Sequence, residues 1–217
     1  MAKKSGTKYV YFFGGGKAEG MTCAKTEKER KLILGGKGSG LADMTAAGLP
    51  VPPGFTITCQ ACDEFYKGGR KWPKGLAEQV EQNIKKVENV LGKTFGQGKN
   101  PLLFSVRSGA AVSMPGMMDT VLNLGLNDET LQSVIDLTGN ERFAYDAYRR
   151  FMQMFGDVVL GIEHHDFEHA LQAVKDRRGA KLDTDLDVEG LKEVVAEYKK
   201  VYEHAGKAFP QDAREQL

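Results

Sequence analysis

Apolar positions follow two different spacings along the chain, and the change between them falls near residue 127. Before that point, short apolar runs stop at glycine or proline, as is typical of strands that lead into turns. After it, apolar side chains recur at helical spacing, which indicates amphipathic helices. The sequence therefore predicts an α+β first part followed by an all-helical second part.

The elements predicted for the first part are short. Strands are predicted over residues 9–13, 31–34, 55–58 and 101–106, the last of them buried, and helices over 41–47 and 76–91. The two helices are expected to end at Gly48 and Gly92, because glycine readily adopts the left-handed conformation that closes a helix.

The second part contains helical patterns only. Helices are predicted over residues 128–137, 141–155, 166–178 and 188–205, each with a glycine at or near its C-terminal end. The chain is thus expected to form three regions. They are an α+β subdomain over residues 1–126, a helical subdomain over 127–205, and a segment over 206–217 that returns toward the first subdomain.

Composition limits the kinds of partner. The chain has 30 lysines and arginines against 29 acidic residues, so its net charge of +1 gives no general attraction to nucleic acid or to an anionic membrane. Its apolar runs fall far short of the roughly 20 residues that cross a membrane. The basic start is not followed by the apolar stretch of a secretory signal. Three cysteines favour a reducing, cytoplasmic location.

A glycine-rich segment, residues 35–40 (GGKGSG), is the first candidate site. Without Cβ atoms, its backbone N–H groups can approach an anion closely, as in a phosphate cradle. A P-loop has serine or threonine after its lysine, whereas Gly38 follows Lys37. Leu41 stands where a dinucleotide fingerprint has its third glycine. From the residues alone, a phosphate site and a solvated surface turn both remain open.

Arg107 is the second candidate. It stands at the end of the predicted strand over 101–106 and enters a loop rich in serine and glycine. A guanidinium offers a rigid donor fork that suits phosphate oxygens, but an internal ion pair is an equally good interpretation. In the following loop, Met114, Met117 and Met118 either fill the core or line a ligand.

Long strings around both candidates resemble the dikinases that form phosphoenolpyruvate, and in particular the pyruvate, phosphate dikinase family. These strings are residues 14–20 (GGGKAEG), 34–44 (LGGKGSGLADM), 48–55 (GLPVPPGF), 105–110 (SVRSGA), 113–125 (SMPGMMDTVLNLG) and 140–154 (NERFAYDAYRRFMQM). They extend over nearly the whole chain in the family's order, which is far more specific than any single short motif.

The resemblance implies the first part of an ATP-grasp nucleotide-binding domain that carries a helical insertion. The implied reaction interconverts ATP, phosphate and pyruvate with AMP, pyrophosphate and phosphoenolpyruvate, through a phosphohistidine and Mg²⁺. Lys37 matches the family's glycine-loop lysine and Arg107 its strand-end arginine, so both are expected to face one cleft and contact the phosphates of ATP. Further loop positions beside the nucleotide are Gly36, Gly38, Met114, Gly116, Asp119 and Thr120.

The resemblance also implies that much of the machinery lies elsewhere. The Mg²⁺ carboxylates, the phosphohistidine domain and the pyruvate-binding domain are expected outside this chain, as parts of a longer, homo-oligomeric enzyme. Alone, the chain is expected to fold, to bind ATP weakly and not to convert ATP to AMP. Two alternatives are a water-dependent relative that makes phosphoenolpyruvate and a nucleotide-binding module without chemistry. Residues 110–115 (AAVSMP) count against the first, because such relatives usually place an acidic pair there.

Three remaining features have simpler interpretations. Cys59 and Cys62 lack the second cysteine pair expected of a zinc site. His165 and His169 have helical spacing, but no glutamate-containing zinc motif surrounds them, so a solvated helix face is the better interpretation. The adjacent arginines at 149–150 either stabilise the helical subdomain or dock the other domains of the enzyme.

Overall fold

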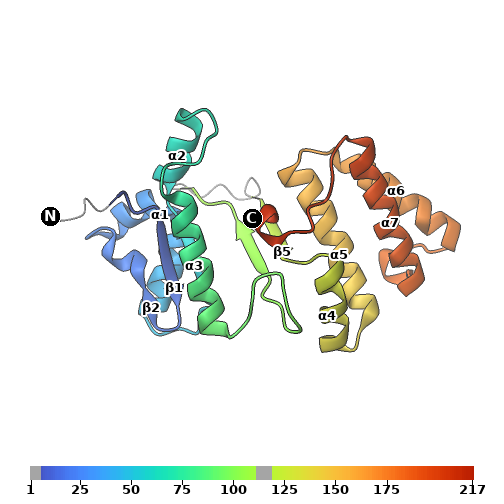
Figure 1. Ribbon diagram of the computed structural model, residues 1–217, viewed down its shortest axis with the longest axis horizontal. Helices are drawn as coiled ribbons and strands as arrows, with labels where there is room; N and C mark the ends of the chain where they lie inside the picture. Colours follow the sequence, from blue (N-terminus) through green and yellow to red (C-terminus); the bar gives the residue numbers. More distant parts are fainter. Residues whose placement is uncertain (1–5, 111–118) are drawn as a thin grey trace. The chain divides into compact units, whose positions relative to one another are not determined.

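The structure, a computed structural model, describes residues 6–110 and 119–217. It divides the chain into two units, Met1–Gly92 with Ser108–Met118, and Lys93–Arg107 with Asp119–Leu217. Each unit combines helices with a small antiparallel sheet (Figure 1). The predicted α+β class with a helical second part is confirmed.

The first unit is built on a three-stranded sheet in the order β2-β1-β3. Its strands are β1 (Val10–Gly14), β2 (Lys17–Ala18) and β3 (Gly54–Ile57), and its helices are η1 (Glu19–Thr22, a 3₁₀ turn), α1 (Glu27–Ala46), α2 (Cys59–Lys67) and α3 (Leu76–Leu91). Alternate side chains of β1 are buried because helices α1 and α3 pack against this sheet (Figure 1). The strands predicted over 9–13 and 55–58 and the helix predicted over 76–91 are confirmed.

The strand predicted over residues 31–34 is wrong, because these residues belong to α1. Thr26 begins this helix with a capping box. Its hydroxyl accepts a hydrogen bond from the Glu29 backbone N–H, and the Glu29 carboxylate accepts one from the Thr26 backbone N–H. One turn further, Lys31 pairs with Glu27 at 2.5 Å. These local contacts favour a helix, whereas the apolar run by itself fits either structure.

The strand predicted over residues 101–106 is also corrected. The observed strand is β4 (Phe104–Arg107), and its last three residues are exposed rather than buried. It pairs antiparallel with β5 (Thr120–Leu124), a strand that the sequence pattern did not reveal. The pattern also missed α2, which is too short to show a clear helical repeat.

The second unit contains four long helices close to their predicted positions. They are α4 (Asp128–Thr138), α5 (Glu141–Met154), α6 (His164–Arg178) and α7 (Val188–His204), with a π-helical turn η2 (Phe155–Val159), a 3₁₀ turn η3 (Asp183–Asp185) and a final short helix α8 (Ala213–Gln216). Residues 128–205 are all described and contain no strand, so the helical prediction for them is confirmed. Left-handed glycines close α4 and α6, at Gly139 and Gly179.

Aromatic rings form the core of this unit and bring the last residues onto it. Edge-to-face contacts link Phe151, Phe155, Phe167, Tyr198, Tyr202 and Phe209. In α8, the Gln216 side chain accepts from the Gly125 backbone N–H at 2.7 Å and donates to the Leu126 carbonyl at 3.1 Å. The C-terminal segment is therefore anchored at the end of β5. The predicted domain boundaries at residues 126 and 205 stay a prediction.

A cluster of ion pairs around the partly buried Glu19 joins β1, η1 and α3 in the first unit. The Glu19 carboxylate accepts from Lys86 at 2.7 Å, from Lys8 at 2.9 Å and from the Phe12 backbone N–H at 3.3 Å. Burial by itself would raise the pKa of Glu19, but the contacts with Lys86, Lys8 and Phe12 outweigh it and lower the pKa to about 2. The ionised carboxylate is therefore favoured by folding.

This cluster predicts a pH-dependent contribution to stability. Because the folded-state pKa of Glu19 is depressed, its contribution is fully present above about pH 5 and is lost as the pH falls toward 2. We expect Glu19→Gln to lower the melting temperature most at neutral pH, with the difference from the unsubstituted chain shrinking below about pH 4.5. Thermal unfolding followed by circular dichroism measures it, with the exposed Glu78→Gln on α3 as the control. A difference independent of pH would contradict the ion-pair explanation.

Candidate functional site

The glycine-rich segment lies inside α1 and divides this helix in two. Gly35 has φ 73° and ψ 167°, so the helix is interrupted there and a second helical segment begins at Gly36. A Cβ at Gly35 would lie 3.2 Å from the carbonyl oxygen of Ala110, and the Gly36 N–H donates to that oxygen at 2.9 Å. Glycine is needed at position 35 for both its positive φ and this close backbone approach.

The helical segment that begins at Gly36 carries Lys37 in its first turn. Lys37 is exposed, and its ammonium donates to the carbonyl of Ser108 at 3.0 Å. Gly38 is buried, and a Cβ there would lie 2.6 Å from the Thr56 side chain. The N-terminal turn of a helix offers backbone N–H groups and a positive dipole end, which together favour an anion. The segment predicted as a phosphate cradle is therefore the start of a helix and not a loop, and its binding of phosphate stays a prediction.

Ser39, in the same turn, has an unusual environment. Its side chain is fully buried, and its hydroxyl has no hydrogen-bond partner among the described residues. A helical serine often donates to the carbonyl four residues earlier, which here belongs to Gly35. A residue that precedes a helix with an extended ψ still turns its carbonyl toward that helix, so the interruption at Gly35 does not explain the unpartnered hydroxyl of Ser39.

The predicted phosphate-binding arginine, Arg107, is the last residue of β4. It pairs with Thr120 across the β4–β5 ladder, so two predicted site positions are neighbours on this ribbon. Arg107 and Asp119 are exposed, and Thr120 is half-buried. Met114 and Gly116, which were also predicted to lie beside the nucleotide, fall outside the described residues.

Lys37 and Arg107 belong to different units, so their approach to a common anion stays a prediction. Within the first unit, however, Lys37 contacts the residue that directly follows Arg107 in the chain. Sequence reasoning missed Ser108 and Ala110, which meet the glycine segment through backbone carbonyls. A backbone carbonyl carries no side-chain signature, so a sequence pattern contains no signal for these contacts.

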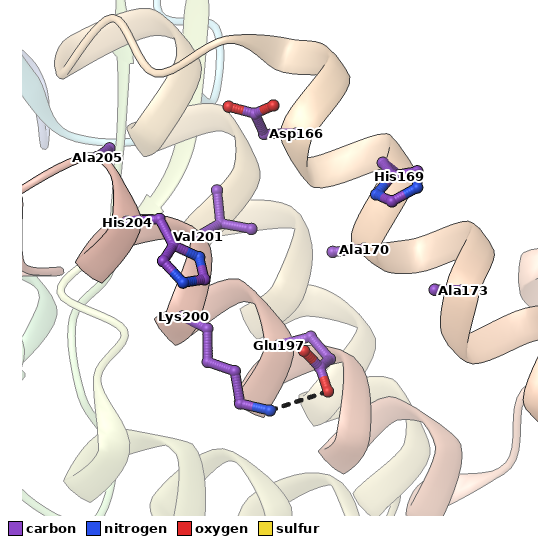
Figure 2. A pocket seen from close by; sticks show the side chains of 9 residues that line it. All are labelled: Asp166, His169, Ala170, Ala173, Glu197, Lys200, Val201, His204 and Ala205. Atoms are coloured by element: carbon purple, nitrogen blue, oxygen red, sulfur yellow. Dashed lines mark hydrogen bonds and ion pairs between the residues drawn. The ribbon is translucent and has the colours of Figure 1, made fainter.

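The histidines and cysteines do not form a metal centre in the described residues. His165 and His169 stack with their ring centroids 6.1 Å apart on the exposed face of α6. Figure 2 shows the hollow between α6 and α7, where a salt bridge of 3.1 Å joins Lys200 to Glu197. Other side chains that line it include Asp166, His169 and His204. In residues 6–110 and 119–217, no group of three or more histidine, cysteine, aspartate or glutamate side chains is placed to hold a metal ion.

Arg149 and Arg150 have different surroundings. For Arg149 they decide between the two roles that the sequence left open, which are stabilising the helical subdomain and docking other domains of the enzyme. The Arg149 side chain is 4% exposed and pairs with Asp146 at 2.9 Å and with Asp183 at 3.0 Å. Lys175 also pairs with Asp183, at 3.1 Å. By contrast, Arg150 is 61% exposed, and within residues 6–110 and 119–217 its ion pair is with Asp146. Arg149 therefore stabilises its own unit by joining α5 to the turn at Asp183.

The fold is an α+β domain with a helical second part, and comparison with known proteins identifies its class as a nucleotide-binding domain. The family model described as "Pyruvate phosphate dikinase, AMP/ATP-binding domain" matches residues 31–73 and 71–208. This chain belongs to that family. No helix in the described ranges is both long and apolar enough to cross a membrane.

Curated relatives agree with the family model. The chain is 59% identical over 97% of its length to pyruvate, phosphate dikinase of Giardia intestinalis, of which it covers 24%. It is 50% identical over 97% of its length to the chloroplastic pyruvate, phosphate dikinase 1 of Arabidopsis thaliana, covering 21% of that protein. It is 49% identical over 97% of its length to pyruvate, phosphate dikinase of Rhizobium meliloti, covering 23% of that protein. The chain thus spans between a fifth and a quarter of the length of these relatives.

Proposed function

We propose that this chain holds the phosphates of ATP for an enzyme that interconverts ATP, phosphate and pyruvate with AMP, pyrophosphate and phosphoenolpyruvate. The observation that carries the proposal is the position of Lys37, on the first turn of a helical segment and against the carbonyl of Ser108. The names of the relatives support the reaction, and the family's description as an AMP/ATP-binding domain supports AMP or ATP as the nucleotide.

In this proposal, the two cations and the helix start perform separate tasks. The backbone N–H groups that follow Gly36 and the ammonium of Lys37 bind phosphate oxygens, while the Gly36 N–H itself donates to Ala110 and Gly38 allows the turn to pack on Thr56. The guanidinium of Arg107 stabilises the negative charge that spreads over the phosphoryl group during transfer. Because the Arg107 side chain is exposed and not packed in the core, it can reach a bound ligand.

The remaining components of the reaction are proposed to lie in other parts of the enzyme. Mg²⁺ would neutralise phosphate charge when bound, and its carboxylate ligands are proposed to lie outside this chain, since no group of three or more ligating side chains is placed to hold a metal ion among the described residues. The complete enzyme is proposed to contain a phosphohistidine domain and a pyruvate-binding domain as well. It is further proposed to be homo-oligomeric and cytoplasmic. The plant relatives from Arabidopsis thaliana and Mesembryanthemum crystallinum are described as chloroplastic. The chain alone is therefore expected not to form AMP from ATP.

Calorimetric titration of the 217-residue chain with ATP tests the binding site. Lys37→Met is expected to weaken ATP binding by roughly tenfold or more, because it removes a charged hydrogen bond to phosphate. Lys31→Met is the matched control, since Lys31 is an exposed lysine of the same helix that pairs with Glu27. Equal affinities for Lys37→Met and the unsubstituted chain would remove Lys37 from the site.

A further inference from the structure

The two cysteines at the start of α2 are placed for chemistry that the proposed function does not use. Thr58 caps this helix by accepting from the Ala61 backbone N–H, so Cys59 and Cys62 both lie in its first turn. Cys62 is exposed and Cys59 is partly exposed, so both can be reached from solvent. Positions three residues apart on a helix face the same side.

Helix α2 packs against α1 in the same unit, and the Cys59 thiol lies beside the glycine segment of α1. Burial raises the pKa of the Cys59 thiol, the Asp63 carboxylate and the Cys62 thiol add to the rise, and a hydrogen bond from the Gly35 backbone opposes it. Cys59 thus contacts the residue at which α1 is interrupted, just before the turn that carries Lys37.

The helix geometry permits a disulfide only if the first turn tightens. Cα atoms three residues apart on an α-helix are about 5 Å apart, inside the range that disulfides span. Their Cβ atoms are roughly 5–6 Å apart, whereas a disulfide needs about 4 Å. Bond formation must therefore draw Cys59 and Cys62 together by about 1 Å or more, which moves Cys59 relative to Gly35.

We propose that Cys59 and Cys62 form a reversible intramolecular disulfide that changes the backbone conformation around Gly35. The Cys62 thiolate attacks one sulfur of a small-molecule disulfide such as oxidised glutathione, whose S–S bond breaks to release one thiol. The Cys59 thiolate then attacks the sulfur of Cys62 and expels the second thiol. Two electrons pass from the cysteine pair to glutathione disulfide, and the two thiol protons end on the released glutathione.

A zinc site at the same cysteines is the competing explanation, and the surroundings disfavour it. Structural zinc is held by four ligands, usually cysteine and histidine. In the part of the chain that the structure describes, no third histidine, cysteine, aspartate or glutamate completes a ligand group with this pair. A dithiol and its disulfide need no further ligand.

Mass spectrometry on the whole 217-residue chain tests the disulfide. After equilibration with mixtures of reduced and oxidised glutathione and alkylation of free thiols, we expect the Cys59–Cys62 peptide to lose two hydrogens while Cys23 remains alkylated. Cys59→Ser is expected to stop at a mixed glutathione disulfide on Cys62, and Cys23→Ser to behave like the unsubstituted chain. The proposal is overturned if the unsubstituted chain also stops at the mixed disulfide, or if both cysteines stay alkylated at every ratio.

Hydrogen exchange tests the link to Gly35. In the oxidised chain we expect the amides of residues 36–40 to exchange several-fold faster than in the reduced chain, and oxidant to have no such effect on Cys59→Ser. Unchanged exchange after disulfide formation would overturn the link. The effect on ATP affinity, an expected several-fold loss, rests on the proposed function. If the reduced chain binds no ATP, the proposed function fails, while the mass and exchange measurements still decide the disulfide and its effect.

Discussion

Replacing Arg149 with methionine should destabilise the second unit by roughly 2 kcal/mol, because Asp146 and Asp183 each lose a buried, charged hydrogen-bond donor. The Arg149 side chain is 4% exposed and holds Asp146 and Asp183 at 2.9 and 3.0 Å. Methionine is similar in length but supplies no charge. Asp183 keeps Lys175, which limits the loss. Urea unfolding, with the midpoint and slope fitted separately, measures the difference.

The neighbouring arginine provides the matched control for this prediction. Arg150→Met removes the same charge from a side chain that is 61% exposed and that pairs with Asp146. Exposed pairs contribute little, so we expect a change within about 0.5 kcal/mol. Equal losses in both variants would show that total charge, rather than the buried contact of Arg149, determines stability.

Replacing Arg107 with alanine should lower the rate of the ATP half-reaction by roughly 10²-fold or more, the usual effect of deleting one donor that stabilises transition-state charge. The measurement needs the complete enzyme that contains this chain, with AMP and pyrophosphate formation followed in single turnovers. Because Arg107 is exposed at the end of β4, the substitution should leave the thermal transition unchanged. Activity and stability can therefore be separated at this residue.

Two further variants define what Arg107 contributes. Arg107→Lys retains the charge but not the planar donor fork, so we expect a rate between those of alanine and arginine. Lys99→Ala removes another exposed cation of the same unit and should leave the rate unchanged. An unchanged rate for Arg107→Ala would assign this residue to the β4–β5 ribbon and not to catalysis.

The helical second part was predictable from sequence because its signals are local. Apolar residues recur at helical spacing there, and glycines such as Gly139 and Gly179 take the left-handed conformation that ends a helix. The three-residue run before Gly35 was misread, since so short a run fits a strand or a helix equally. The sequence did contain the deciding signal, the capping box of Thr26 and Glu29, which starts α1 well before that run.

For the candidate site as well, some features follow from local sequence and others depend on contacts between distant residues. By itself, the sequence determined the family, the helical second part, and the choice of Lys37 and Arg107 as candidates, because long strings and residue types are readable along one chain. The tertiary structure alone decided that Lys37 meets the Ser108 carbonyl and that Gly38 packs on Thr56. Such contacts join residues far apart in sequence, and they depend on how helices and strands pack, which no local pattern encodes.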